Sequence, residues 1–589
     1  MKNKLHIVVG IVALVAAQFV SAQEKDLRKV VFTGAARGLY YGDKMGQEVE
    51  DSITIPRMNS GHTLVDLGMN IRPNRNTEIQ GMVRVRNDYG GFWGSGVSFD
   101  IRQLYIKGVA GGIVRYQLGD INYKLSPYTL SNTQQEIITQ GPVVFQQQTR
   151  LMNYDNFYAA DSSWRQQGAA AEFGLQFAKY FKELQFHTVA TRVRSTDFGS
   201  INDRLFAGYN VNLVQSDFLE VGVNHVTLFD IEGTSRNLST FHNPVTTGTL
   251  LLKKDFSNWK MRLNVEAGTS KTYYKNFEDS PETNGKIFDA KWLGTNASKG
   301  LSVEAGWKYV SSDFRSPGAQ TKRVNYNYQP TSFGRITNDQ VVRNLTSFDL
   351  MRESNAYNRQ LSSNLMLIQP KYDNITPCGT ATPNRQGVTV NARYISPKQL
   401  FEISATQLML QETRGEGTLI PRKFMRSEVK AVAHLSKVLQ KVLRMIPLSD
   451  FKSLGSKDKL FDVSVRFRND NTSREAEENV RAVDLSTQIL SVGMEYEFWD
   501  NWDLMLGLQQ ITFNGFDYTA VRNNFSEIYY FNEYQTDGME FMQAAGLRYR
   551  FSEKSSLSVN LSNFKNTDDF DATQNYSIRQ FMLLYQMNF

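Results

Sequence analysis

Residues 576–589 read YSIRQFMLLYQMNF, and this last stretch of the chain decides the fold. Five apolar side chains stand at every second position in it, namely Phe581, Leu583, Tyr585, Met587 and Phe589. Alternation with a period of two is the pattern of a β-strand with one apolar face. The pattern recurs along the whole chain, which favours a membrane barrel over the edge strand of a soluble β-domain.

The aromatic C-terminal end of this strand is similar to a known recognition signal. Phe589, preceded at alternate positions by Met587 and Tyr585, resembles the signal by which the barrel assembly machinery of the outer membrane recognises its clients. The resemblance covers only the last strand, so it implies a class, a gram-negative outer-membrane β-barrel, and no substrate. It also implies two partners, namely outer-membrane lipid and, during biogenesis, the assembly machinery.

The first residues indicate export. Met1 to Lys4 is basic, Leu5 to Val20 is apolar, and Val20-Ser21-Ala22 has the small residues of a cleavage site. We therefore predict a signal peptide over residues 1–22 and a single barrel domain over residues 23–589. The single cysteine, Cys378, leaves no internal disulfide to hold the fold.

Composition agrees with a barrel and argues against other classes. The mean hydropathy is −0.41 although 12% of the residues are aromatic, as expected when strands expose only alternate side chains to lipid. A soluble propeller would show a fixed internal period of about 40 to 50 residues, which we do not find. The net charge of +7 is spread along the chain and gives no reason to expect a nucleic-acid partner.

Period-two segments predict an all-β, antiparallel, up-and-down transmembrane barrel of about 22 strands, within a range of roughly 16 to 24. The predicted strands lie near residues 30–41, 62–72, 78–88, 97–108, 112–124, 165–178, 184–195, 204–215, 217–228, 245–255, 259–272, 286–296, 299–312, 386–395, 399–411, 422–434, 459–469, 480–498, 501–515, 537–552, 555–566 and 575–589.

Short and long connections alternate between these strands, as short periplasmic turns and long extracellular loops do in such barrels. The long ones include Ser126 to Trp164 and Asp313 to Arg385. One connection breaks the alternation: residues 435–455 should form a short turn, yet apolar residues repeat there at helical spacing up to Pro447. We expect a short periplasmic amphipathic helix, which either covers the barrel mouth, lies on the membrane rim or docks a partner.

The strand around Val463 and Val465 separates its side chains cleanly, with Arg466 and Arg468 on the opposite face. Because an Arg or Lys on the lipid side costs about 2 to 4 kcal/mol at the bilayer midplane, the polar faces should point into the lumen. The predicted lumen-lining residues include Arg72, Arg84, Arg86, Arg102, Arg115, Arg262, Arg466, Arg468, Arg548, Arg550, Asp66, Asp88, Asp100, Glu495 and Glu497.

These charges allow two interpretations. In the simpler one, arginines and acids on neighbouring strands pair and neutralise the wall. In the other, arginines on strands two to five and on strand twenty form one basic sector and set up a transverse field, in a layout similar to that of general porins. The pore would then favour polar solutes, with anions preferred.

A barrel of this size would enclose a wide hole, since 16 to 18 strands already enclose an aqueous channel. Only residues 23–29 precede the first strand, so the chain lacks the N-terminal plug of TonB-dependent transporters. We expect the loop over residues 313–385, or Ser126 to Trp164, to be extracellular or to fold inward. Two segments, Gly119 to Tyr128 and Ser316 to Lys322, look specific without indicating a chemistry, and loop packing is their simplest explanation.

The sequence favours a channel for polar solutes over other functions. The alternative is a sealed barrel that acts as a structural or docking subunit of an outer-membrane secretion, assembly or surface complex. We predict no enzyme, because no histidine has a nucleophile motif such as GxSxG beside it. We also predict no cofactor and no metal site, because no histidine stands at metal-ligand spacing.

Overall fold

The computed structural model describes residues 29–47, 58–89, 97–131, 141–156, 166–276, 282–320, 374–436, 459–478, 480–522, 528–570 and 575–589. The predicted signal peptide, most of the 313–385 loop and the 435–455 segment beyond residue 436 lie outside these ranges. Within them, no helix is both long and apolar enough to cross a membrane.

Twenty-two strands make up the sheet, with lengths from 8 to 25 residues. They are β1 (Lys29–Gln47), β2 (Met58–Asn74), β3 (Thr77–Asp88), β4 (Val97–Ala110), β5 (Val114–Ile121), β6 (Gln166–Gln176), β7 (Glu183–Arg194), β8 (Arg204–Val214), β9 (Leu219–Asp230), β10 (Thr240–Phe256), β11 (Trp259–Lys275), β12 (Thr283–Asn296), β13 (Leu301–Val310), β14 (Arg385–Ile395), β15 (Phe401–Gln411), β16 (Lys423–His434), β17 (Phe461–Arg474), β18 (Val483–Trp499), β19 (Trp502–Arg522), β20 (Ile528–Ser552), β21 (Ser555–Asp568) and β22 (Tyr576–Asn588).

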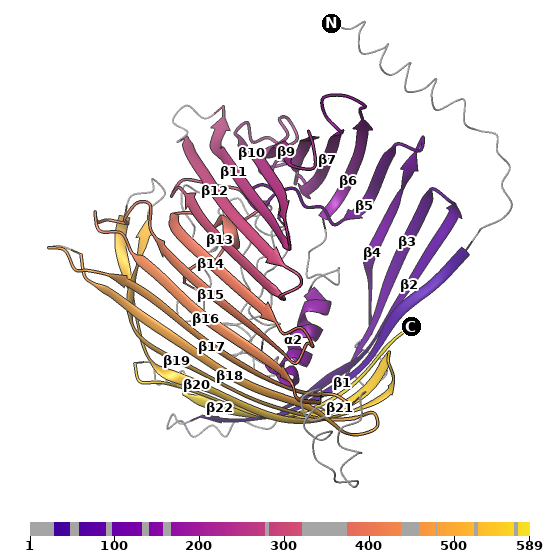
Figure 1. The fold of residues 1–589 in the computed structure, drawn as a ribbon, viewed down its shortest axis with the longest axis vertical. Helices are drawn as coiled ribbons and strands as arrows, with labels where there is room; N and C mark the ends of the chain where they lie inside the picture. Colours follow the sequence, from indigo (N-terminus) through magenta and orange to yellow (C-terminus); the bar gives the residue numbers. More distant parts are fainter. Residues whose placement is uncertain are drawn as a thin grey trace, which may run out of the picture.

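Each strand pairs antiparallel with the next one along the chain, and β22 pairs with β1 to close the barrel (Figure 1). The prediction of an up-and-down barrel of about 22 strands is therefore confirmed. Phe589 completes the closure, because its N–H donates to the carbonyl of Gly34 and its own carbonyl accepts from the Gly34 N–H, both at 3.0 Å. The last residue thus extends the pairing that removes the open sheet edge.

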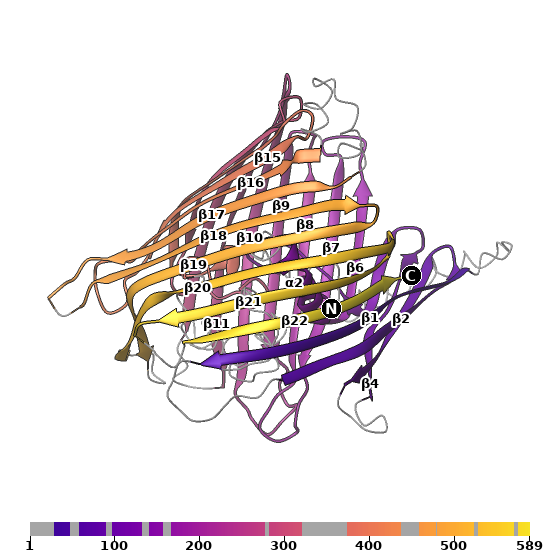
Figure 2. The ribbon, with the colours of Figure 1, turned by 90° about the horizontal axis from the view of Figure 1, so that it is seen from below.

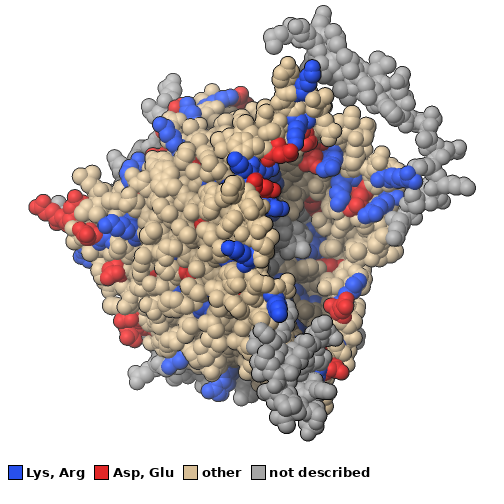
Figure 3. All heavy atoms as spheres, in the orientation of Figure 1, with Lys and Arg blue, Asp and Glu red and all other residues tan. Residues whose placement is uncertain are grey.

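The two faces of the wall follow the alternation. On β17, Val465 and Phe467 face outward with 41% and 45% exposure, whereas Arg466 and Arg468 face inward and are buried. Most of the outer surface over β13 to β17 is uncharged, and charged side chains gather at its ends and around the central hollow (Figure 3). An apolar outer wall is what a lipid-facing barrel requires, because ionised groups are costly in hydrocarbon.

The inner wall is not uniformly polar. Inward-facing Met582 and Leu584 of β22 are 1% exposed and pack with Leu39, Tyr41 and Leu151. Leu151 belongs to α2 (Val143–Asn156), a helix that lies inside the barrel (Figure 1). A polar lumen face alone would not need such a cover, so apolar patches on the wall indicate where the chain folds inward.

We call the end of the barrel with the short connections the short-turn end, and the opposite end the long-loop end. Lys29 and Phe589 lie at the short-turn end, together with tight turns such as that at Asn501, whose φ is 66°. The connection from β16 to β17 remains the exception, and its predicted helix lies outside the described residues beyond the first two positions.

Candidate functional site

Helix α2 narrows the lumen from one side. Pro142 stands immediately before it, where its missing N–H is not needed, and its carbonyl accepts from the N–H of Phe145 at 3.0 Å. Val144 packs against Gly507 of β19 so closely that a Cβ there would lie 2.5 Å from the valine methyl group. Gln147 accepts a hydrogen bond of 2.8 Å from Asn560 of β21. The first half of the helix is therefore fixed to the wall.

The second half of α2 ends on charged residues of β2 to β4. The phenol of Tyr154 donates to Asp66, which is fully buried and also accepts two hydrogen bonds of 2.8 Å from Arg84. The Arg102 guanidinium lies over the Tyr154 ring at 4.0 Å and donates to the Tyr154 carbonyl. Burial and then the bond to Asp66 raise the pKa of Tyr154 to about 12, so the neutral phenol is the docked form.

Two segments far apart in sequence pack together inside the barrel at the long-loop end. Ser316 donates from its hydroxyl to the Tyr128 carbonyl at 2.7 Å, and the Ser131 N–H donates to the Gly318 carbonyl at 2.9 Å. These are the two segments that the sequence marked as specific but could not explain. Their role is to pack on one another, which the sequence analysis gave as the simplest explanation.

The inner faces of β5 to β13 supply an apolar bed for these segments. Tyr128, Leu130 and Phe314 are 0% exposed and pack on inward residues such as Phe206 and Val226. The described end of the 313–385 loop joins them, because Gln320 donates to the Ala381 carbonyl at 3.2 Å. This cluster, which we call the inner loop core, covers one side of the lumen with tightly packed side chains.

Polar contacts tie the inner loop core to the wall. Ser126 donates to Glu266 of β11 at 2.6 Å, and the Tyr128 phenol donates to Asp289 of β12 at 2.9 Å. Arg315 is 1% exposed and donates to the carbonyls of Ser312 and Phe314, while burial lowers its pKa to about 10. A buried polar group that keeps its partners specifies one arrangement of the loop.

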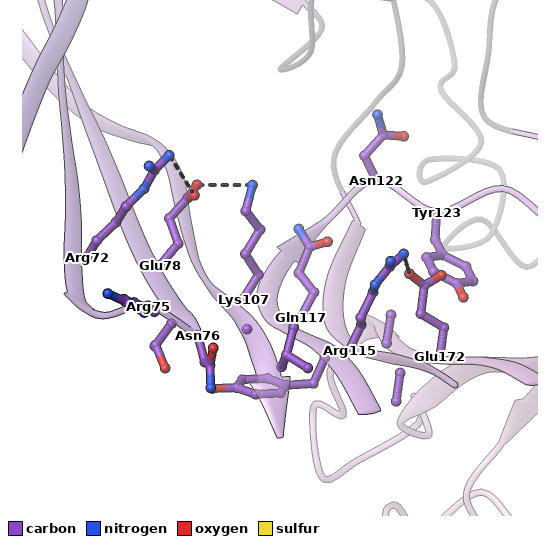
Figure 4. A pocket seen from close by; sticks show the side chains of 16 residues that line it. Arg72, Arg75, Asn76, Glu78, Lys107, Arg115, Gln117, Asn122, Tyr123 and Glu172 are labelled. Carbon is purple, nitrogen blue, oxygen red and sulfur yellow. Dashed lines mark hydrogen bonds and ion pairs between the residues drawn. The ribbon is translucent and has the colours of Figure 1, made fainter. Parts of the chain in front are cut away.

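A cavity of about 450 Å³ opens on the inner face at the short-turn end of β2 to β6 (Figure 4). Its charged lining consists of four cations and two carboxylates: Arg72, Arg75, Lys107, Arg115, Glu78 and Glu172. Glu78 is shared, at 3.5 Å from the Arg72 guanidinium and 3.0 Å from the Lys107 ammonium. Four cations and two carboxylates give this lining a net charge of +2.

The cations of this cavity remain accessible. The side chains of Arg72, Lys107 and Arg115 are 57%, 47% and 74% exposed, and Arg115 meets Glu172 at 3.2 Å. Glu172 also faces His187, whose ring nitrogen lies 3.2 Å from the carboxylate and from the Tyr123 phenol. Exposed cations around a concave site are able to attract an anionic solute and release it again.

The predicted lumen arginines form separate ion-paired clusters rather than one basic sector. Arg548 and Arg550 meet Asp503 as well as Glu495 and Glu497, and Arg466 meets Glu428. The other predicted residues are placed as follows: Arg468 meets Asp470 and Arg86 meets Asp88 at 2.8 Å, Asp100 is exposed opposite Arg84, and Arg262 is exposed near the start of β11. Cross-strand and same-face pairing thus neutralises most of the wall.

Some lumen residues escaped the sequence analysis for identifiable reasons. A β-bulge between β3 and β4 shifts the register after Arg102, so Tyr105 and Lys107 face inward while Leu104 faces outward with 53% exposure. Helix α2 was hidden by its run of glutamines, although Val144, Gln147 and Leu151 do stand on one helical face. Within the described residues, no group of three or more potential ligand side chains is arranged to hold a metal.

No family model and no curated protein matches the chain. Among solved structures it is similar to the translocation pore of the P pilus usher PapC, with 7% identity and a TM-score of 0.40 over 95% of this chain and 99% of that one. It is also similar to Pseudomonas aeruginosa OccK8 (OprE), with 8% identity and a TM-score of 0.31 over 95% and 98%. A third match is the outer-membrane channel DcaP of Acinetobacter baumannii, with 10% identity and a TM-score of 0.27 over 97% and 99%.

The closed sheet and its apolar outer wall identify the architecture. The protein is a transmembrane β-barrel. Closure leaves every strand paired on both sides, which is the condition for crossing hydrocarbon with strands. Its lumen holds α2, the inner loop core and the cavity at the short-turn end of β2 to β6, which we call the cationic cavity.

Proposed function

We propose that the barrel is a constricted channel that passes small polar solutes across the outer membrane and prefers anions. The cavity at the short-turn end carries this proposal, because its exposed cations outnumber its carboxylates by two. Other lumen arginines, such as Arg466 and Arg548, are ion-paired with carboxylates, which weakens the field that they set up to select solutes by sign. Helix α2 and the inner loop core support a narrow path rather than an open pore.

The test is ion selectivity in planar bilayers. Under a potassium chloride gradient, the reversal potential should indicate a preference for chloride in the native protein. The double variant Arg72→Gln, Arg115→Gln removes both excess charges from the cavity, so its preference should fall toward none. Arg192→Gln is the matched control, because Arg192 has 56% exposure and pairs with Asp203 outside the cavity.

Two results of the bilayer measurement would contradict the proposal. Equal reversal potentials in the native protein, the double variant and the control would contradict the assignment of selectivity to the cavity. Complete absence of conductance from folded protein would contradict the channel itself.

The second candidate is a sealed barrel that serves as a structural or docking subunit of a larger outer-membrane complex. The packing of the inner loop core favours it, since Tyr128, Leu130 and Phe314 are fully buried inside the barrel. It would be supported by subunits that co-purify in fixed ratio in mild detergent together with the absence of conductance. Isolation of a conducting protein on its own would count against it.

A further inference from the structure

The outer wall carries one row of polar side chains across four neighbouring strands. In the pairing register, Gln543 of β20 lies opposite Asn563 of β21, Asn563 opposite Arg579 of β22, and Arg579 opposite Lys44 of β1. These strands lie side by side on one face of the barrel (Figure 2). The side chains of Arg579 and Lys44 point outward, because their sequence neighbours Gln580 and Asp43 are buried on the inner face.

Two cations face each other in this row without an acid. Arg579 and Lys44 are direct cross-strand partners and both are exposed. Among the residues that the structure describes, no carboxylate forms an ion pair with either of them, in contrast to the paired arginines of the lumen. Like charges directly opposite on a sheet destabilise it, so an anion bound between these two cations would stabilise the pairing of β1 with β22.

The Lys44 end of the row lies at the height of a membrane interface. Phe32 on the outer face of β1 is 70% exposed near the short-turn end, and Lys44 is twelve residues further along the same strand. At about 3.3 Å per residue and a tilt of about 45°, the two side chains are separated by roughly 28 Å across the membrane. This separation matches the apolar band of such barrels, about 25 Å tall, so Lys44 and Arg579 lie at the level of the headgroups on the long-loop side.

A depression of about 1130 Å³ adjoins the row on the apolar side. Its outward lining includes Phe581, Leu561, Leu506 and Val492, and Leu561 is 60% exposed. In the register, Phe581 and Leu561 lie immediately below Arg579 and Asn563 along their strands. A pair of cations above an apolar hollow is complementary to a lipid with an anionic headgroup and an acyl chain.

We propose that Lys44 and Arg579 bind the phosphate of an anionic lipid in the external leaflet, with one of its acyl chains in the depression below. Asn563 and Gln543 extend the polar row and offer amide donors to the same headgroup. The bound lipid supplies a negative charge to two cations that have no acidic partner among the residues described by the structure. The site is independent of the lumen and of the channel function.

The experiment compares the full-length protein with Lys44→Gln, Arg579→Gln in neutral detergent micelles. Phosphatidylglycerol is the probe, phosphatidylcholine is the uncharged reference, and native mass spectrometry counts the bound lipid. Arg192→Gln is the control, because it removes an outward cation that already has an acidic partner. The double variant should lose affinity for phosphatidylglycerol by about 25-fold, as expected for two cations near a lipid phosphate.

Two results would overturn the proposal. One is equal retention of phosphatidylglycerol by the native protein and the double variant, with melting curves that show both to be folded. The other is displacement of the lipid by inorganic phosphate at equal concentration, which would mean that the cations bind free phosphate without using the depression. Native retention that depends on both cations and resists phosphate supports the site.

Discussion

Replacing Tyr154 by phenylalanine should loosen helix α2 from β2 to β4 while leaving the barrel intact. The phenol hydroxyl donates to Asp66, a fully buried carboxylate, and hydrogen bonds to charged groups contribute about 1.5 to 3 kcal/mol. Because Asp66 keeps its two bonds to Arg84, the carboxylate is not left unpaired. The docked population of the helix should therefore fall by roughly 10- to 150-fold relative to the released one.

Single-channel recording provides the assay. A released α2 no longer narrows the lumen, so Tyr154→Phe should spend more time in a high-conductance state than the native protein. Tyr154→Ala should go further, because it also removes the ring beneath Arg102, a contact of about 1 to 2 kcal/mol. Tyr180→Phe is the matched control, since Tyr180 is 88% exposed in the turn after β6. Identical conductance in both Tyr154 variants and the native protein would refute the role of α2 as a constriction.

Two further predictions concern the same lumen. Asp503→Ala should lower the free energy of unfolding by about 3 kcal/mol, because Asp503 is fully buried between Arg548 and Arg550. The control is Leu508→Ala, on the outer face of the same strand. Equal melting temperatures for the two variants would contradict this prediction. The pKa of Tyr154 is raised from 10.0 to about 12, so its stabilisation of the docked helix should be complete below about pH 10 and disappear as the pH rises through about 12. The conductance of the native protein should rise over that pH range. The Tyr154→Phe variant should show no such step.

The sequence predicted the wall well because the period of a strand is two. Once Val465 and Phe467 are assigned to lipid, Arg466 and Arg468 must face inward, and no longer-range information is needed. The same logic failed after Arg102, where one extra residue on β4 reverses the faces and brings Lys107 into the cationic cavity. A bulge depends on the pairing of two strands, so one strand read alone does not reveal it.

The partners of each charge also lay beyond the sequence. Arg548 finds Asp503 and Glu495 because β18, β19 and β20 pair in one particular register, which the alternation does not specify. The amino-acid sequence alone was therefore compatible both with paired charges and with one basic sector. The structure divides the arginines among several acid-lined clusters, and the cavity at β2 to β6 carries two more cations than carboxylates.

The amino-acid sequence by itself determined the closed antiparallel wall, its strand number and the direction of most side chains, because these follow from local alternation and from the lengths of connections. The tertiary structure alone decided what occupies the lumen. Ser316 meets Tyr128, and Tyr154 meets Asp66, across 188 and 88 residues of chain. Such contacts depend on closure of the barrel, which brings distant loops and walls within reach of each other, and no local pattern records them.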